Sequence, residues 1–219
     1  MVTQLYPGTP GNDTVSGTYD LMNGEEGNDR LTSDYSSNSV DVIFIGGAGN
    51  DILGLKDLSL SRAVMFGNSG NDTLNGANHD DRLYGGSGND KLFGKDGDDF
   101  LFGGPGNDVL APSDGADRLY FDTRLNADKN VDHVQGFDLS DTFYLDRGIF
   151  PTIAPGYLTD EAFVIGPKAT EPDDRIIYQK STGKLFFDAD GSKDNHHQIL
   201  FAVVDNKADL TYSDFYIYA

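Results

Sequence analysis

Apolar and polar positions recur with a fixed nine-residue period through the middle of the chain, from Gly67 to Tyr120. Each unit carries aspartate at its sixth position and leucine at its eighth. The aspartates are Asp72, Asp81, Asp90, Asp99, Asp108 and Asp117, and the leucines are Leu74, Leu83, Leu92, Leu101, Leu110 and Leu119. Because the last three positions of a unit fit an outward, inward, outward alternation, the pattern predicts a turn followed by a short strand.

The turn half of each unit is rich in glycine, which permits positive φ angles and a close approach between backbones. Two units make one coil, so each unit is expected to stack on the unit two further along, at a strand spacing of about 4.8 Å. The sequence therefore predicts an all-β fold, a parallel β-roll or right-handed β-solenoid. Stacking sorts the aspartates into two columns, one of Asp72, Asp90 and Asp108 and one of Asp81, Asp99 and Asp117.

Stacked carboxylates repel one another, and at an effective dielectric of about 20 two charges about 4 Å apart cost on the order of 4 kcal/mol. A hard divalent cation between coils removes this conflict. Ca²⁺ accepts about six to eight oxygens with tolerant geometry, whereas Mg²⁺ demands a tight octahedron. We expect several Ca²⁺ ions, roughly four or more, at the pairs Asp72/Asp90, Asp81/Asp99, Asp90/Asp108 and Asp99/Asp117. The alternative is a metal-free solenoid whose aspartates only cap turns.

Two units, GGSGNDKLF (85–93) and GGPGNDVLA (103–111), match the pattern G-G-x-G-x-D-x-U-x at every defined position, as does GGAGNDILG (46–54) outside the run. The chain thus resembles the repeats-in-toxin (RTX) family over roughly residues 8–145. The resemblance implies calcium ligation by aspartate side chains and by main-chain carbonyls of the turns. The implied ligands are the aspartates above, Asp13, Asp29, Asp51, and the turn residues Gly67, Ser69, Gly70, Gly85, Gly86, Ser87, Gly88, Gly94, Asp96, Gly97, Gly103, Gly104, Pro105 and Gly106.

Two units of the regular run depart from the family pattern. Unit 76–84 has Ala77 and His79 where glycines are expected, and unit 112–120 begins with Pro112 and Ser113. These residues still offer carbonyl oxygens, but their turns are expected to be distorted.

The spacing loosens before the regular run. Asp13 and Asp29 each follow a glycine turn, and Asp20 fits a shortened unit between them. Asp41 precedes a strand-like VIFIG segment, and residues 63–66 fit a strand whose unit has lost its aspartate. We interpret the irregular steps as loop insertions on a continuing roll with fewer metal sites.

The C-terminal part has a different composition. The roll is expected to end near Asp132 and Asp141, which are again nine residues apart. Residues 146–219 then predict an antiparallel β cap, which would cover the unpaired strand edges at the end of a roll spanning residues 8–145. The predicted strands are 162–166, 175–179, 184–188, 199–204 and 214–219.

The end of the chain resembles an uncleaved type I secretion signal, and the whole C-terminal part resembles that of RTX exoproteins. The residues concerned are Asp214 to Ala219, for which an ordinary final strand is the alternative. Met1 to Gly11 contains no basic segment followed by an apolar one, so no cleavable signal peptide is expected there. We therefore expect a secreted or cell-surface protein that engages the type I secretion machinery; a cytosolic protein is the other possibility.

Charge and composition exclude several classes of partner. The chain has 36 acidic and 16 basic residues and a formal charge of −20, which repels nucleic acid and anionic membranes. It has no cysteine, which excludes disulfides and thiolate metal sites. No apolar run approaches the roughly 20 residues that span a bilayer.

No catalytic motif is present in the sequence, and the chain is not expected to be an enzyme. The histidines His79, His133, His196 and His197 form no H-E-x-x-H motif. Ser69 lies in a repeat turn and not in a nucleophile elbow. Residues 188–194 resemble the start of an acidic calcium loop, although a simple turn between strands fits equally well.

The sequence favours a calcium-responsive module that is exported unfolded and folds outside the cell. One alternative is a surface, adhesion or ice-binding protein. Ice binding would need a threonine row, which Asn68, Ala77 and Gly86 do not continue from Thr9 and Thr18. The other alternative is the tail of a larger RTX exoenzyme, with a catalytic or adhesive domain upstream.

Overall fold

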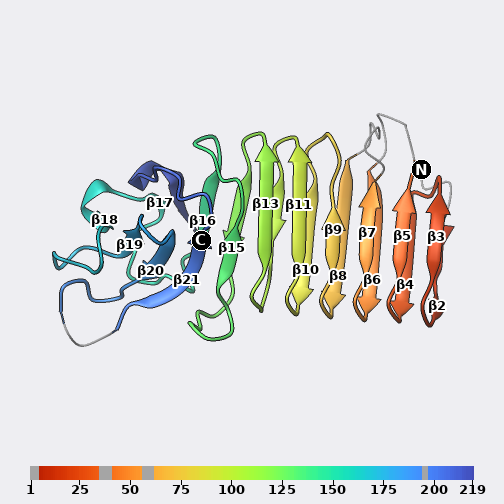
Figure 1. Cartoon of the computed structure of the whole chain (residues 1–219), viewed down its shortest axis with the longest axis horizontal. Coiled ribbons are helices and arrows are strands. Elements are labelled where there is room, and N and C mark those ends of the chain that lie inside the picture. The colour runs from red at the N-terminus through yellow and green to blue at the C-terminus, as the bar shows by residue number, and fades with distance from the viewer. Residues whose placement is uncertain (1–4, 35–40, 56–61, 194–196) are drawn as a thin grey trace.

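The computed structural model describes residues 5–34, 41–55, 62–193 and 197–219. Short parallel strands wind into a two-sided roll, and the C-terminal part closes one end of it (Figure 1). Within the roll, successive strands alternate between two sheets, so that each regular coil contributes one strand to each sheet. The predicted all-β roll is confirmed. No helix in the described part of the chain is long and apolar enough to cross a membrane.

In both sheets the strands are stacked one after another along the axis of the roll. The first contains, in spatial order, β1 (Leu5–Tyr6), β4 (Leu21–Glu26), β6 (Val42–Ala48), β8 (Ala63–Ser69), β10 (Arg82–Ser87), β12 (Phe100–Phe102), β14 (Arg118–Phe121), β16 (Thr142–Asp146), β22 (Phe215–Tyr218) and β17 (Gly156–Tyr157), with β2 (Thr9–Pro10) also beside β4. The second contains β18 (Phe163–Ile165), β19 (Ile176–Gln179), β20 (Lys184–Phe187), β21 (Ile199–Val204), β15 (Asp132–Val134), β13 (Val109–Asp114), β11 (Lys91–Asp96), β9 (Thr73–Asn75), β7 (Ile52–Leu55), β5 (Arg30–Ser33) and β3 (Thr14–Gly17). Two short 3₁₀ helices, η1 (Asp160–Ala162) and η2 (Tyr212–Asp214), complete the described elements.

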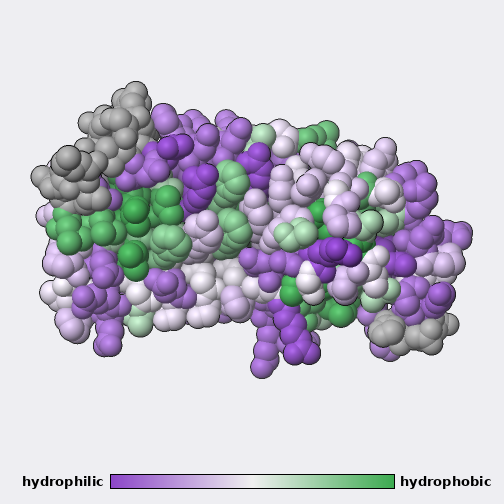
Figure 2. Space-filling model, turned by 180° about the vertical axis from the view of Figure 1, so that it is seen from behind, coloured by the Kyte–Doolittle hydropathy of each residue, from purple (hydrophilic) through white to green (hydrophobic). Residues whose placement is uncertain are grey.

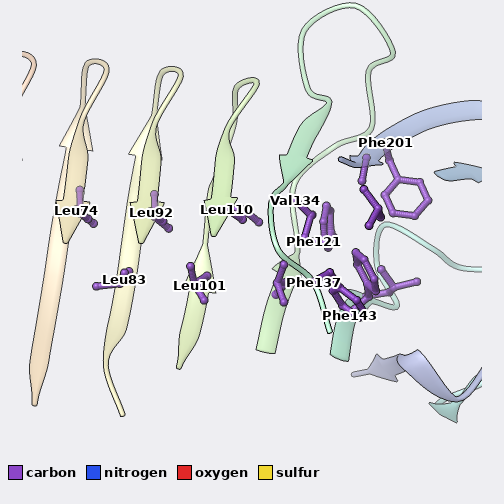
Figure 3. Packing of buried hydrophobic residues seen from close by; sticks show 14 of the residues in the cluster. Leu74, Leu83, Leu92, Leu101, Leu110, Phe121, Val134, Phe137, Phe143 and Phe201 are labelled. Carbon is purple, nitrogen blue, oxygen red and sulfur yellow. The ribbon is translucent and has the colours of Figure 1, made fainter. Parts of the chain in front are cut away.

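The leucine of each regular unit points into one narrow core between the sheets. All six leucines are 0% exposed, and several are seen stacked along the roll in Figure 3. A slip of one residue would turn every side chain to the opposite face, so this burial holds the register. The stacks are Leu83, Leu101 and Leu119 in the first sheet, and Leu74, Leu92 and Leu110 in the second, which confirms the predicted 18-residue coil.

The irregular units upstream continue both sheets. β4 pairs with β6, placing Leu21 opposite Ile43, and β6 pairs with β8. Asp20 therefore belongs to a shortened unit, and residues 63–66 form part of β8, as predicted. In the first sheet of these coils, other apolar side chains take the place of leucine in the core, namely Met22, Phe44 and Met65.

The C-terminal part extends both sheets of the roll. β21 pairs with β15 and β22 with β16, in both cases in parallel. β19, β20 and β21 pair with one another in antiparallel fashion. The five predicted strands correspond to β18 to β22. Aromatic side chains fill the core at this junction, where the rings of Phe143 and Phe201 lie 5.8 and 5.5 Å from that of Phe121 (Figure 3).

The outward side of the first sheet carries a stack of aromatic rings at the ninth position of its units. The centroids of Phe66, Tyr84, Phe102, Tyr120 and Tyr144 follow one another at 4.9, 4.6, 4.0 and 4.9 Å. Seen from behind, hydrophobic side chains gather toward the N-terminal end of the roll (Figure 2). Cross-strand ring pairs stabilise a sheet, so this stack supports the coils from outside the core.

Candidate metal centre

The aspartates of the repeat form a hydrogen-bonded row along one edge of the roll, which we call the first edge. The main-chain N–H of each aspartate donates to Oδ1 of the aspartate in the next coil, from Asp72 to Asp90 at 2.7 Å and from Asp90 to Asp108 at 2.8 Å. The predicted column is confirmed and extends in both directions. The full row is Asp13, Asp29, Asp51, Asp72, Asp90, Asp108 and Asp132.

The second edge carries a shorter row of the same kind. Asp81 N–H donates to Asp99 Oδ1, and Asp99 N–H to Asp117 Oδ1, both at 2.7 Å. The row ends at Asp141, which accepts from Asp117 N–H at 3.2 Å. At its other end, Ala63 N–H donates to Asp81 Oδ1 at 2.6 Å. The second predicted column is also confirmed.

The second carboxylate oxygen is without a hydrogen-bond partner in seven of these aspartates, among the residues that the structure describes. All seven side chains are 2% exposed or less. A buried carboxylate oxygen that loses water and gains no donor is costly, so these positions call for a compensating cation or proton. They are Asp29, Asp51, Asp72, Asp90 and Asp108 on the first edge, and Asp99 and Asp117 on the second.

Carbonyl oxygens of the next coil converge on the same places. A Cβ built on Gly67 would lie 2.4 Å from Asp72 Oδ2 and 2.3 Å from Gly85 O. At Gly85 the corresponding distances, to Asp90 Oδ2 and Gly103 O, are both 2.5 Å. Only glycine leaves this space free, and the oxygens that gather over it come from two successive coils.

Burial also shifts the acidity of these groups. Loss of hydration raises the pKa of Asp72 and Asp108 to about 7 and that of Asp99 to about 9, and neighbouring aspartates of the rows add to the rise. The hydrogen bond from the preceding coil offsets only part of it. Without a cation the rows therefore tend to hold protons near neutral pH.

The chemistry of this donor set fits calcium. Hard carboxylate and carbonyl oxygens are the ligands that Ca²⁺ takes, in a flexible coordination sphere. Within the described ranges no three His, Cys, Asp or Glu side chains gather closely enough to hold a metal by themselves. A site here must therefore combine an aspartate Oδ2 with main-chain oxygens of the turns, as the repeat supplies.

The predicted turn ligands lie between successive coils, where many already bond the chain. The carbonyl oxygens of Ser69, Ser87 and Pro105 accept the N–H of Gly49, Gly70 and Gly88, respectively, at 2.8 to 3.1 Å. The side chains of Ser69 and Ser87 are exposed and reach carbonyl oxygens at 3.4 Å. Each carbonyl has a second lone pair, so these hydrogen bonds leave room for a cation.

One row of functional side chains was not anticipated from the sequence. The asparagine at the fifth position of first-edge units accepts the N–H of the next asparagine, from Asn71 to Asn50 and from Asn89 to Asn71 at 2.7 Å. This outer row has the opposite direction to the aspartate row, whose oxygens accept from the preceding coil. The repeated Asn-Asp pair in the sequence is the signal that could have revealed it.

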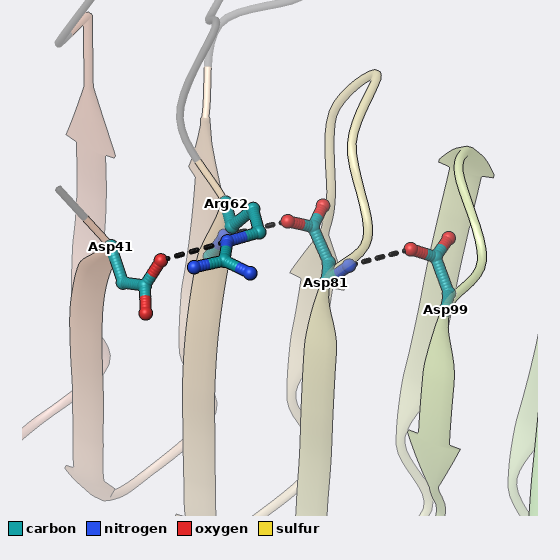
Figure 4. Close-up of polar contacts among 5 residues, drawn as sticks. Asp41, Arg62, Asp81 and Asp99 are labelled. Atoms are coloured by element: carbon teal, nitrogen blue, oxygen red, sulfur yellow. Dashed lines mark hydrogen bonds and ion pairs between the residues drawn. The ribbon is translucent and has the colours of Figure 1, made fainter. Parts of the chain in front are cut away.

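The second edge has a gap in its N-terminal half. The register places Val42 and Ala63 where later coils have aspartate. Arg62 joins the two coils at this gap. Its carbonyl accepts Val42 N–H at 2.9 Å, and its Nε lies 3.0 Å from Asp41 Oδ1 (Figure 4). The Asp41 carboxylate, paired with Arg62, has no buried oxygen without a partner.

The acidic segment that begins at Asp188, which the sequence offered as a possible calcium loop, forms a tight turn. Asp188 Oδ1 accepts the N–H of Asp190 at 3.2 Å and of Gly191 at 3.1 Å. Asp194, the last residue of the segment that the sequence marked as a possible calcium loop, lies outside the described residues.

Comparison with known proteins agrees with this geometry. A family model of the RTX calcium-binding nonapeptide repeat matches the chain in four copies, at residues 7–34, 41–53, 64–92 and 84–119. The matched segments include the turns of all seven aspartates whose Oδ2 has no hydrogen-bond partner. No curated protein sequence matches the chain significantly.

Proposed function

Because the chain is an RTX-type repeat protein with calcium-binding repeats in a β-roll, we propose that it is a secreted module that folds when it binds Ca²⁺ outside the cell. The observation that carries the proposal is the set of seven buried aspartate oxygens without a partner. Their mutual repulsion opposes folding when calcium is scarce. Calcium bound between the coils turns the same oxygens into a stabilising contact.

The calcium concentration determines by mass action whether the chain is folded. A ligand that binds only the folded state stabilises it by RT ln(1 + [L]/Kd), which is about 1–2 kcal/mol per site when calcium exceeds Kd by roughly tenfold. Extracellular calcium modules bind in roughly the 10⁻⁴ to 10⁻³ M range. Several sites in one roll add up, so millimolar calcium favours the coiled state and a calcium-poor cytosol favours the loose chain.

Export before folding is supported by the place of the proposed secretion signal. Phe215 and Ile217 in β22 are 0% exposed, and the strand lies between β16 and β17. A secretion machine can read this segment only while it is unfolded. Folding outside the cell then buries it as a structural strand, so one segment serves both roles.

We also propose that this chain has no catalytic activity of its own, because most of the buried carboxylates of its roll belong to the two rows. The register disfavours ice binding, since Thr9 stands in line with Glu25, Gly47 and Asn68 instead of further threonines. The attachment of an upstream catalytic or adhesive domain is compatible with the same module and stays an alternative.

Circular dichroism in chelator and in millimolar Ca²⁺ tests the central proposal. We expect a cooperative gain of β signal on adding calcium, and a smaller effect of Mg²⁺ at equal concentration. Identical spectra in chelator and in calcium would rule out calcium-driven folding. For the export step, deletion of residues 214–219 should stop secretion through a type I exporter, while Asp90→Asn should still be secreted.

A further inference from the structure

The turns of the roll fall into two conformational classes. In the first class, which we call open turns, the second residue of the unit has a φ between +75° and +114°. The aspartate of every open turn is one of the seven with an unpartnered Oδ2. The second residues of the open turns are Glu25, Gly47, Asn68, Gly86, Lys95, Gly104 and Ser113.

The second class, which we call closed turns, lacks the positive φ at that position. Their aspartates accept a main-chain N–H from their own turn on Oδ2. The donors are Thr9 to Asp13 at 2.9 Å, Ala77 to Asp81 at 2.7 Å, and Asp138 to Asp141 at 2.9 Å. None of these three oxygens is among the buried unpartnered atoms.

A flip of the peptide that joins the first and second residues accounts for the first two closed turns. This flip changes the sign of φ at the second residue and exchanges the directions of the N–H and the C=O. In the closed turn of Asp81, the N–H of Ala77 faces the carboxylate. In the open turns the first-residue carbonyl, such as Gly85 O, faces the carboxylate of the preceding coil, here Asp72. Gly94 O lies beside Asp81 Oδ2 in the same way, but there Ala77 N–H already bonds Oδ2. At the open turns no donor bonds Oδ2, so oxygen meets oxygen and a cation must bridge them.

We infer that this turn conformation, and not the presence of an aspartate, decides where the roll binds calcium. The inference rests on the proposed calcium binding and refines it. The seven aspartates of the open turns hold calcium. Asp13, Asp81 and Asp141 cap the rows without metal, because two donors already satisfy the carboxylate, as Ala63 N–H and Ala77 N–H do at Asp81.

Calcium is then distributed unequally between the two edges. The first edge binds it continuously from Asp29 to Asp108. On the second edge, among the described residues, only Asp99 and Asp117 belong to open turns, since Asp81 is capped and the two coils before it carry Val42 and Ala63. There the Arg62 guanidinium beside Asp41 takes the place of a cation.

Asp81→Asn and Asp99→Asn form a matched pair, because the two aspartates are neighbours in one row and both are 0% exposed. Bound calcium is counted by native mass spectrometry at saturating Ca²⁺, and Tm is measured in calcium and in chelator. Asp99→Asn should lower the count by at least one and reduce the rise in Tm that calcium produces. Asp81→Asn should keep the wild-type number of bound calcium ions and lower Tm equally in both solutions. The side-chain NH₂ of asparagine would replace Oδ2, and it cannot accept the hydrogen bond that Ala77 N–H donates.

Asp41→Asn and Asp51→Asn provide a second pair, from opposite edges of one coil. Asp41→Asn should leave the calcium count unchanged, and Asp51→Asn should reduce it. A count lowered by Asp81→Asn or Asp41→Asn, or unaffected by Asp99→Asn, would overturn the assignment while leaving calcium binding intact. A wild-type chain with no bound calcium would instead refute the proposed function and the assignment together.

Discussion

Gly88→Ala tests whether the contact between coils, beyond glycine's backbone freedom, holds the roll together. Gly88 has a φ of +133°, and a Cβ there would lie 1.7 Å from Gly70 O of the preceding coil. Gly11 has the same place in the first glycine turn of the described chain, with a φ of +145° and no atom within 4 Å of its Cβ position. The two glycines therefore share the backbone strain of a substitution and differ in the steric clash.

The expected difference in stability between the two variants follows from the hydrogen bonds that Gly88→Ala must weaken. Both alanines carry the strain of an unfavourable φ, on the order of 1–3 kcal/mol. Only at Gly88 must the two coils separate, which weakens the bonds from Gly70 N–H to Ser87 O at 2.9 Å and from Asn89 N–H to Asn71 Oδ1 at 2.7 Å. Each is worth about 0.5–1.5 kcal/mol net. Gly88→Ala should thus cost about 2 kcal/mol more than Gly11→Ala, or roughly 4–8 °C in Tm for a chain of this size.

Thermal unfolding followed by circular dichroism in excess Ca²⁺ measures this difference with the metal sites saturated. Gly166→Ala is the control for glycine loss as such, because its Cβ position is 3.8 Å from the nearest atom and its φ is outside the left-handed region. Equal losses of Tm for Gly88→Ala and Gly11→Ala would refute the claim that coil-to-coil packing requires glycine at this position.

Three further results are expected. Asp90→Asn keeps an oxygen for Asp72 N–H but removes a buried charge, so the β signal in chelator should exceed that of the wild type; a signal below it would contradict the proposed repulsion. In chelator the metal-free roll should gain β signal as pH falls from 8 to 5, because the pKa of Asp72 and Asp108 is raised to about 7 in the folded state from 3.8. This stabilisation is complete below about pH 4 and is lost as pH rises through 7; a pH-independent spectrum would argue against it. Leu101→Ala should cost about 2–5 kcal/mol in urea denaturation with calcium present, whereas Lys91→Ala, at an exposed outward position, should change little.

Much of the fold was predictable because the repeat acts locally. Alternation around Leu92 or Leu110 places one side chain inside, and the glycine turns reverse the chain after each short strand. The two aspartate columns follow from the coil length alone. The C-terminal strands were also predictable from their apolar runs, although their parallel pairing with β15 and β16 was not, because pairing partners far apart in sequence leave no local signal.

The candidate site was predictable in type and less so in detail. Calcium as the ligand follows from stacked aspartates and oxygen-rich turns. The replacement of aspartate by Val42 and Ala63 is visible in the sequence only once the register is known, since insertions obscure the alignment there. The closing of that gap by Arg62 depends on a carbonyl and a guanidinium meeting the neighbouring coil.

The sequence by itself determined the coil, the inward leucines and the rows of aspartate, because each depends on the spacing of residues along one chain segment. The tertiary structure alone decided which aspartates stay open to a cation. Asp81 and Asp99 have the same spacing and the same burial, yet Ala77 N–H bonds Oδ2 of Asp81, whereas no donor among the described residues reaches Oδ2 of Asp99. The difference lies in the orientation of one peptide and in the coil stacked against it, which no periodicity encodes.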